Sequence, residues 1–439
     1  MSTPQTGNLS RDPNQDLRDL LDQATDILRE PQPEAPVQAP RRAGPVTSEG
    51  TPTITLVEDE FGILRWRIGE PVPAITTLSG RRMVSPNVEG EVIWENEVQD
   101  LGTNTVTGMI QALDRKLNPN QGLRELKDGA LNKVDVNGIS PKGPILVFVH
   151  GTFSKTEAFL EELKSIQEGK DYLRWAQSNY AQILAFDHAT ISTNPFLNAF
   201  ELARLLNQTK AAVDVVCHSR GGLVTRWWLE MLDRDDRERR RAVVAGSTLR
   251  GTSLAAPDRV RKGFEHLSNM VRAVGAVASA IPFTAGISGL MSIAASCVGA
   301  VAHIPAIDAL FAMVPGLAAM SRIQNNTELA DLQAAKGNAV EYFGVKSNFE
   351  PPEVKIWQFW KAFNRPLDRV KNALADDFIF RDEQGNPLPN DLVVDCEAMD
   401  GIPPCVVKEW CDFGTSPVVH HTNYFAQPET VRFIRAKLS

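Results

Sequence analysis

The sequence predicts an α/β fold built on a mostly parallel sheet with helices on both sides. Two observations support this prediction. Continuous apolar runs such as PILVFVHG (144–151) and AQILAFD (181–187) are typical of strands that are buried on both faces of a parallel sheet. Stretches with helical character separate these runs, and strands that alternate with helices indicate a doubly wound sheet.

The size and charge of the chain restrict its class. With 439 residues, of which 43% are hydrophobic, the chain can form one large core with appendages. The formal net charge of −8 argues against a nucleic-acid partner, because such proteins use a basic surface to displace counterions. We therefore expect a globular protein that binds no nucleic acid.

The first 143 residues divide into three predicted segments without recognisable chemistry. Residues 1–30 contain an amphipathic helix, and its leucine stripe is expected to dock on this protein or on a partner. Residues 31–50 are rich in proline and predict an extended linker. Residues 51–143 contain short alternating stretches, such as TITLVED, that predict a small β-rich segment.

Residues 144–439 form the predicted main domain, in which helices and strands alternate. After the first strand, we expect helices near 155–178 and 195–208, strands at 181–187 and 213–218, a helix up to about 233, and strands at 241–246 and 339–345. The charged run DRDDRERRR (233–241) is expected to form a solvated turn. An insertion of about 256–335 separates the last two strands.

The stretch VDVVCHSRGG (213–222) places a serine between a predicted strand and a predicted helix. Gly221 and Gly222 allow two backbones to pass closely in a strained turn around Ser219. The helix that follows directs its free N–H groups at any oxyanion formed beside the serine. The pattern is close to G-x-S-x-G, with Cys217 in place of the first glycine, and predicts a nucleophile elbow.

A serine nucleophile needs a base, and in the order Ser…Asp…His the base follows Ser219. Two of the later histidines, His266 and His303, lie in or beside the insertion, ahead of the last predicted strand. The pair in VVHHTNYF (418–425) remains. We favour His421, because it leads into the final helix, and keep His420 as the alternative.

The orienting acid and the oxyanion hole also have candidates. PNDLVVDCEAMD (389–400) offers Asp391, Asp395 and Asp400. We favour Asp391, which follows a turn and precedes an anchoring apolar run, with Asp395 as its competitor. The oxyanion hole is expected to combine the backbone N–H of Arg220 with that of Thr152, in the loop VHGTFS after the first core strand.

From about residue 144 to the C-terminus, the chain resembles a bacterial lipase-like α/β-hydrolase family, related to lipases and inositol-deacylase-type proteins. The resemblance lies in the stretches LVFVHGTFS, VDVVCHSRGGLVTRW, GSTLRGTSLA, PGLAAM, NDLVVD and HHTNYF. It implies a serine ester hydrolase with Ser219, Asp391 and His421 as the triad and Thr152 and Arg220 at the oxyanion hole. Two positions depart from the family pattern: Cys217, and Leu392 where glycine often follows the acid.

The insertion contains a long uncharged stretch, residues 273–303. Its length raises the possibility of a transmembrane span, but Pro282, Gly286 and Gly289 interrupt it, and it lies between two sheet strands. We expect helices that form a lid over the active site and favour acyl chains, with peripheral contact to a lipid surface. A buried helical hairpin without a substrate role is the alternative.

The leading functional hypothesis is a lipase-like or esterase-like serine hydrolase that acts on a hydrophobic ester and needs no metal or organic cofactor. A phospholipase or acyltransferase with the same triad is one alternative, and a non-catalytic hydrolase-fold binding module is another. The five scattered cysteines and the polar start without a signal peptide predict free thiols and a cytoplasmic location. One disulfide among Cys396, Cys405 and Cys411 stays open.

Overall fold

The computed structural model describes residues 13–29, 53–60, 62–69, 75–76, 82–83, 90–98, 101, 105–255, 262–265, 268–269, 280–298, 310, 313–322, 326–350, 388–401 and 406–439. The expected linker at 31–50 lies outside these residues. The helices are α1 (Pro13–Arg29), α2 (Val106–Leu117), α3 (Thr156–Ser165), α4 (Gln167–Asn179), α5 (Pro195–Leu206), α6 (Gly221–Arg226), α8 (Ala280–Val298), α10 (Pro315–Ala318), α11 (Thr327–Ala334), α14 (Cys396–Asp400) and α15 (Pro428–Leu438). Short helical turns are η1 (Val136–Gly138), η2 (Trp227–Leu232), η3 (Ser253–Ala255) and η4 (Tyr424–Ala426).

The strands are β1 (Thr53–Glu58), β2 (Leu64–Gly69), β3 (Ile75–Thr76), β4 (Arg82–Met83), β5 (Glu91–Glu97), β6 (Gly122–Lys127), β7 (Ala130–Lys133), β8 (Ile145–Val149), β9 (Gln182–Asp187), β10 (Val213–His218), β11 (Arg240–Ala245), β12 (Glu341–Phe349) and β13 (Val407–Ser416). β3 and β4 form a two-stranded sheet, and β1 lies between β2 and β5 in a small antiparallel sheet.

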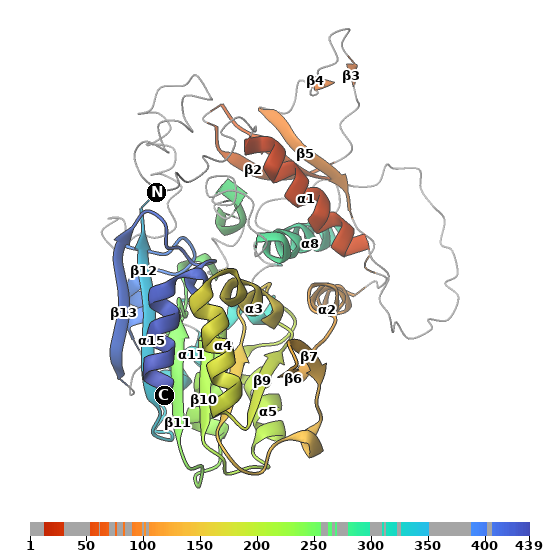
Figure 1. Cartoon of the computed structure of the whole chain (residues 1–439). Coiled ribbons are helices and arrows are strands. Elements are labelled where there is room, and N and C mark those ends of the chain that lie inside the picture. Colours follow the sequence, from red (N-terminus) through yellow and green to blue (C-terminus); the bar gives the residue numbers. More distant parts are fainter. Residues whose placement is uncertain are drawn as a thin grey trace, which may run out of the picture.

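An eight-stranded sheet in the order β13-β12-β11-β10-β8-β9-β6-β7 forms the centre of the fold (Figure 1). The strands from β13 to β9 run parallel to their neighbours, and β6 and β7 extend the sheet in antiparallel fashion. The predicted α/β class with a mostly parallel sheet is therefore confirmed. The sheet starts at β6, ahead of the domain boundary expected at residue 144; the division into domains itself stays a prediction.

Helices cover both faces of this sheet. Leu146 and Phe148 of β8 belong to an apolar cluster with side chains of α3, α4 and α15. Ile145, Val147 and Val149 of the same strand belong to a second cluster, which includes side chains of α5 and α6. Since successive side chains of a strand point to opposite faces, β8 must be apolar at every position, as its sequence is.

The strand order creates a crevice at one edge of the sheet. β8 lies between β9 and β10, so the chain leaves β8 toward one side of the sheet and later returns on the other. Loops that follow two such strands diverge, and in open α/β sheets ligands bind in the crevice between them. The loops after β8 and β10 carry Thr152 and Ser219.

The charged run 233–241 forms the expected turn, with Asp235, Asp236, Glu238 and Arg239 exposed, but it also contains a buried ion network. Arg237 donates through Nε and Nη2 to the two carboxylate oxygens of Asp233, at 2.6 Å each, and neither side chain is exposed. Arg240 donates to the same carboxylate at 2.7 Å. Buried charges are tolerated when they are paired, and this run supplies both partners itself.

The N-terminal elements pack together beyond one end of the large sheet (Figure 1). α8 contacts α1, α2, β1 and β2, and the leucine stripe of α1 is buried. Trp94 of β5 donates its indole N–H to Asp22 of α1 at 3.0 Å. Among the described residues, no helix has the length and hydropathy needed to cross a bilayer. Cys217, Cys396 and Cys411 carry free thiols, and the side chains of Cys297 and Cys405 lie outside the described residues.

Packing of α1 against the rest of the chain can be tested by removing one buried side chain. Leu21 is fully buried in the apolar cluster that also contains α8 side chains. Leu21→Ala should lower the free energy of unfolding by about 2–5 kcal/mol, because it leaves a cavity, as measured by urea denaturation. The control Gln23→Ala, at an exposed position of the same helix, should change it by less than about 0.5 kcal/mol. Equal stability of the two variants would contradict this packing.

Candidate active site

Ser219 occupies a strained turn between β10 and α6. Its φ angle is +54°, in the left-handed region that non-glycine residues rarely adopt. The turn is held by two backbone hydrogen bonds of 3.0 Å, from the N–H of Ser219 to Ala245 and from the N–H of Gly222 to Ser219. Such strain persists only where the surrounding structure enforces it, and it occurs in nucleophile elbows.

Two glycines allow the loops after β8 and β10 to meet at this turn. A methyl group at Gly151 would lie 2.7 Å from Cβ of Ser219, and one at Gly221 would lie 2.4 Å from the carbonyl oxygen of Val149. Both distances are shorter than any side chain tolerates. Glycine is therefore required at both positions, and the loop that contains Thr152 lies directly against the serine.

Asp391 and His421 form a hydrogen-bonded pair. Nδ1 of His421 lies 2.8 Å from Oδ2 of Asp391, and both side chains are buried. The backbone N–H of His421 also donates to the carbonyl oxygen of Asp391, at 3.0 Å. Because Nδ1–H donates its hydrogen bond to the carboxylate, Nε2 is the ring nitrogen left as an acceptor.

Three further donors fix the Asp391 carboxylate. Oδ1 accepts the backbone N–H groups of Val393 at 3.1 Å and Val394 at 2.8 Å. Oδ2 accepts the hydroxyl of Tyr424 at 3.0 Å. Burial and the neighbouring Asp391 hold the pKa of Tyr424 well above its usual value, so this hydroxyl keeps its proton. Tyr424 follows the two histidines in the sequence, but nothing in the local sequence pattern identifies it as a partner of the acid.

The loop around Asp391 contains Leu392, at the position where the lipase-like pattern often has glycine. The φ angle of Leu392 is +86°. The backbone therefore takes a conformation suited to glycine, although the residue is leucine. The hydrogen bonds from Val393 and Val394 to the Asp391 side chain, together with one from the N–H of Asp391 to the carbonyl of Val394, hold this tight turn.

The alternative candidates are engaged elsewhere. Asp395 caps α14 through the N–H of Ala398 and pairs with Arg322 at 2.8 Å. His420 contacts Thr422 and Asn423, and burial lowers its pKa to about 4. Asp400 pairs with Lys346. The other two histidines weighed as bases, His266 and His303, lie outside the described residues.

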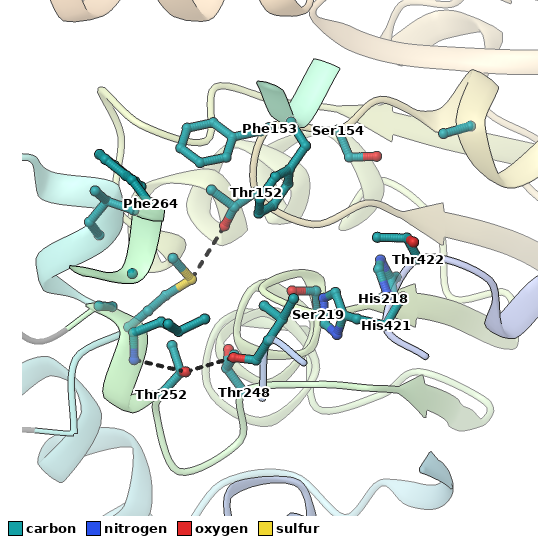
Figure 2. Close-up of a pocket in the computed structure, with 18 of the residues that line it drawn as sticks. Thr152, Phe153, Ser154, His218, Ser219, Thr248, Thr252, Phe264, His421 and Thr422 are labelled. Atoms are coloured by element: carbon teal, nitrogen blue, oxygen red, sulfur yellow. Dashed lines mark hydrogen bonds between the residues drawn. The ribbon is translucent and has the colours of Figure 1, made fainter. Parts of the chain in front are cut away.

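Ser219 and His421 line one cavity, together with His218 and Thr152 (Figure 2). His218 donates its Nε2–H to the carbonyl oxygen of His421 at 2.8 Å, and the two rings lie 4.5 Å apart. Burial holds the pKa of His218 well below its usual value, so this ring is neutral. His218 therefore fixes the backbone of His421, a role that its place beside the serine does not reveal.

Two backbone N–H groups are available beside Ser219. Within the described part of the chain, no hydrogen bond uses the backbone N–H of Thr152 or of Arg220. The Arg220 side chain is buried away from the solvent and donates to the carbonyl of Thr193 at 2.6 Å and to Asn198 at 2.7 Å. Burial lowers its pKa to about 10, which leaves the guanidinium charged at neutral pH. The described residues contain no cluster of three or more His, Cys, Asp or Glu able to hold a metal ion.

Comparison with known proteins gives a family. The model of a family described as a domain of unknown function, DUF7379, matches residues 119–439. The chain belongs to this family. The DUF7379 region begins just before β6, so it includes the antiparallel edge of the large sheet. No curated protein sequence matches the chain.

Three solved structures are similar to parts of this DUF7379 protein. A lipase from Bacillus licheniformis in its mature form is 14% identical, with a TM-score of 0.38, over 68% of this chain and 94% of that one. Lipase 1 from Pelosinus fermentans is 13% identical, with a TM-score of 0.39, over 67% and 98%. A metagenomic carboxyl esterase is 16% identical, with a TM-score of 0.32, over 71% and 79%. These likenesses are too distant to assign an activity.

The Asp391–His421 pair depends on the absence of a side chain at Gly246. A methyl group there would lie 2.9 Å from Oδ2 of Asp391 and 3.2 Å from Nδ1 of His421. Gly246→Ala should therefore displace the pair and remove the low-field proton NMR signal expected of the His421 Nδ1–H bond to a carboxylate. The control is Gly414→Ala, because Gly414 has a similar positive φ but open space around it. A signal that survives in Gly246→Ala, or that disappears equally in both variants, contradicts the pairing.

Proposed function

We propose that this protein is a serine carboxylic-ester hydrolase that cleaves a hydrophobic ester through an acyl-enzyme on Ser219. The observation that carries the proposal is the buried Asp391–His421 hydrogen bond, next to a cavity shared by His421 and a serine with a strained backbone. Nucleophile, base and acid follow one another along the chain in the order of the α/β-hydrolase triad. Asp391 holds His421 in the tautomer whose Nε2 accepts a proton.

In the proposed reaction, the Ser219 oxygen attacks the ester carbonyl carbon while Nε2 of His421 takes the hydroxyl proton. The carbonyl oxygen becomes an oxyanion that accepts hydrogen bonds from the N–H groups of Thr152 and Arg220. The tetrahedral intermediate collapses as the bond to the alcohol oxygen breaks, and His421 returns the proton to that oxygen. Water, activated by the same ring, then hydrolyses the acyl-enzyme to release the acid and restore Ser219.

The part of the cavity formed by the insertion supports a hydrocarbon acyl group. Phe264, Leu317 and Met320 of the insertion line it, next to Leu254. Thr152 and Thr252 are its polar neighbours, and Figure 2 labels both together with Phe264. Phe283 of α8 also lines the cavity and packs edge-on against Phe153, with ring centroids 5.4 Å apart. We infer that α8 and the neighbouring insertion segments form the lid of the site.

The strained serine argues against a binding module without catalysis. A left-handed φ at a non-glycine residue costs about 1–3 kcal/mol, and here it occurs at a serine that shares a cavity with an intact Asp–His pair, as expected of a catalytic nucleophile. A phospholipase or an acyltransferase would use the same triad, so the acceptor and the alcohol must be identified by substrate profiling.

The proposed nucleophile is tested by covalent labelling with a fluorophosphonate. Ser219→Ala should abolish labelling and ester turnover, because it removes the oxygen proposed to form the covalent bond. Asp391→Asn should reduce turnover on the order of 10³–10⁴-fold, because it stabilises the wrong tautomer of His421. The control Ser178→Ala, at an exposed serine of α4, should label normally. Labelling that persists in Ser219→Ala would end the proposal.

The acyl-binding role is tested by changing the volume of the part of the cavity that the insertion forms, called here the insertion arm, at Leu317. Leu317→Trp should lower the ratio of p-nitrophenyl octanoate to p-nitrophenyl acetate hydrolysis by about tenfold, since the larger ring occupies space needed by the longer chain. Leu317→Ala, which enlarges the same space, should not lower this ratio. Each ratio is measured within one variant, so partial loss of folded protein cancels. An unchanged ratio in Leu317→Trp would place the acyl chain elsewhere.

A further inference from the structure

The cavity has a second arm, formed by α3 and the segment after His421. Its lining residues are Ala158, Phe159 and Glu162 of α3, with Thr422 and Phe425. The rings of Phe159 and Phe425 lie 4.4 Å apart, and His218 packs edge-on against both, at 6.0 and 5.9 Å. This arm therefore combines aromatic rings with one carboxyl group.

Glu162 has no cation to balance it. Its Oε2 accepts the backbone N–H of Phe425 at 3.1 Å, and among the described residues it forms no ion pair. The described residues that line the cavity include no lysine or arginine and no other acidic side chain. Burial raises the pKa of Glu162 to about 8, while the Phe425 N–H lowers it. Glu162 is half-buried at the cavity wall, so a cationic ligand in the cavity would gain a direct charge pair with its carboxylate.

The position of this arm identifies which part of the substrate it meets. In the proposed reaction His421 returns its proton to the leaving oxygen, so the alcohol must lie on the His421 side of Ser219. Thr422 directly follows His421, Phe425 lies in the short helical turn after it, and Phe159 packs on the same His218 ring that lies against His421. The α3 arm is accordingly the alcohol side, opposite the apolar arm of the insertion.

We propose that the α3 arm selects esters whose alcohol carries a permanent positive charge, such as a quaternary ammonium group, through Glu162 and the rings of Phe159 and Phe425. The proposal rests on the proposed esterase function, because that function defines the alcohol side. Aromatic faces attract cations, most strongly where water is excluded, and a carboxylate nearby adds a direct charge pair. The structure thus assigns the substrate class as a hydrophobic acyl ester of a cationic alcohol.

Other titratable groups near the arm do not replace Glu162 in this role. His218 is neutral, and His421 is bound to Asp391. Of the other charged groups on α3 and the elements packed against it, Glu157 and Asp187 are both bound by Arg124, and Glu161 and Lys164 are exposed. On α4, Glu168 is bound by Arg432, and the remaining charged groups are Lys170 and the ion pair Asp171–Arg174.

Binding of two matched esters tests the proposal without requiring turnover. Butyrylcholine and its uncharged carbon isostere, 3,3-dimethylbutyl butyrate, are titrated into the Ser219→Ala protein by calorimetry. At pH 9, where Glu162 is ionised, butyrylcholine should bind about tenfold more tightly than the isostere. At pH 6.5 the preference should shrink, because a carboxyl with a pKa of about 8 is then mostly protonated.

Two glutamine variants in the same Ser219→Ala background complete the test. Adding Glu162→Gln should bring the two affinities together at both pH values, whereas Glu161→Gln, an exposed neighbour on α3, should keep the preference. Equal binding of the two esters at pH 9, or a preference that survives Glu162→Gln, overturns the proposal. Turnover of p-nitrophenyl acetate and of butyrylcholine by the protein with Ser219 intact tests the esterase function separately. Hydrolysis without binding discrimination refutes the cation site alone. Discrimination without any hydrolysis refutes the esterase function, and with it the assignment of the α3 arm to the alcohol.

Discussion

The site depends above all on the hydrogen bonds that converge on the Asp391 carboxylate. Two backbone N–H groups, a tyrosine hydroxyl and the His421 ring all donate to its two oxygens. This network joins the turn after residue 389 to the loop before α15, segments far apart in the chain. With the carboxylate fixed, the His421 imidazole has one orientation and one favoured tautomer. This fixed orientation holds the imidazole at the wall of the cavity that Ser219 also lines.

That arrangement requires unfavourable backbone conformations at two residues. Ser219 and Leu392 both have positive φ angles, each of which costs about 1–3 kcal/mol. The strands behind them offset the cost, since β8, β10 and β11 are buried in apolar clusters on both faces of the sheet. Close approach at Gly151, Gly221 and Gly246 then leaves no space into which the turn at Ser219 or the Asp391–His421 pair can relax.

The sequence predicted the parts of this design that depend on local pattern. Continuous apolar runs identified β8, β9 and β10, because a strand buried on both faces has no alternation to conceal it. The spacing around Ser219 likewise indicated a tight turn, and its φ angle shows one. Local pattern could not reveal Tyr424 as a partner of Asp391, or His218 as a support for His421, because both contacts form only when distant segments meet. The run 233–241 is exposed over much of its length, as predicted, but composition could not show that Asp233 and Arg237 pair in a buried position within it.

Charge is distributed unevenly around the cavity, and this gives its two arms different chemistry. Burial keeps His218 neutral, and Arg220 turns its guanidinium away from the serine toward Thr193 and Asn198. The oxyanion proposed beside Ser219 would therefore be stabilised by backbone N–H dipoles, which stay fixed during the reaction and require no reorganisation. A lysine or arginine in the cavity lining would also balance the charge of Glu162. Because none of the described lining residues is a lysine or arginine, Glu162 gives the α3 arm its negative charge, while the insertion arm stays apolar.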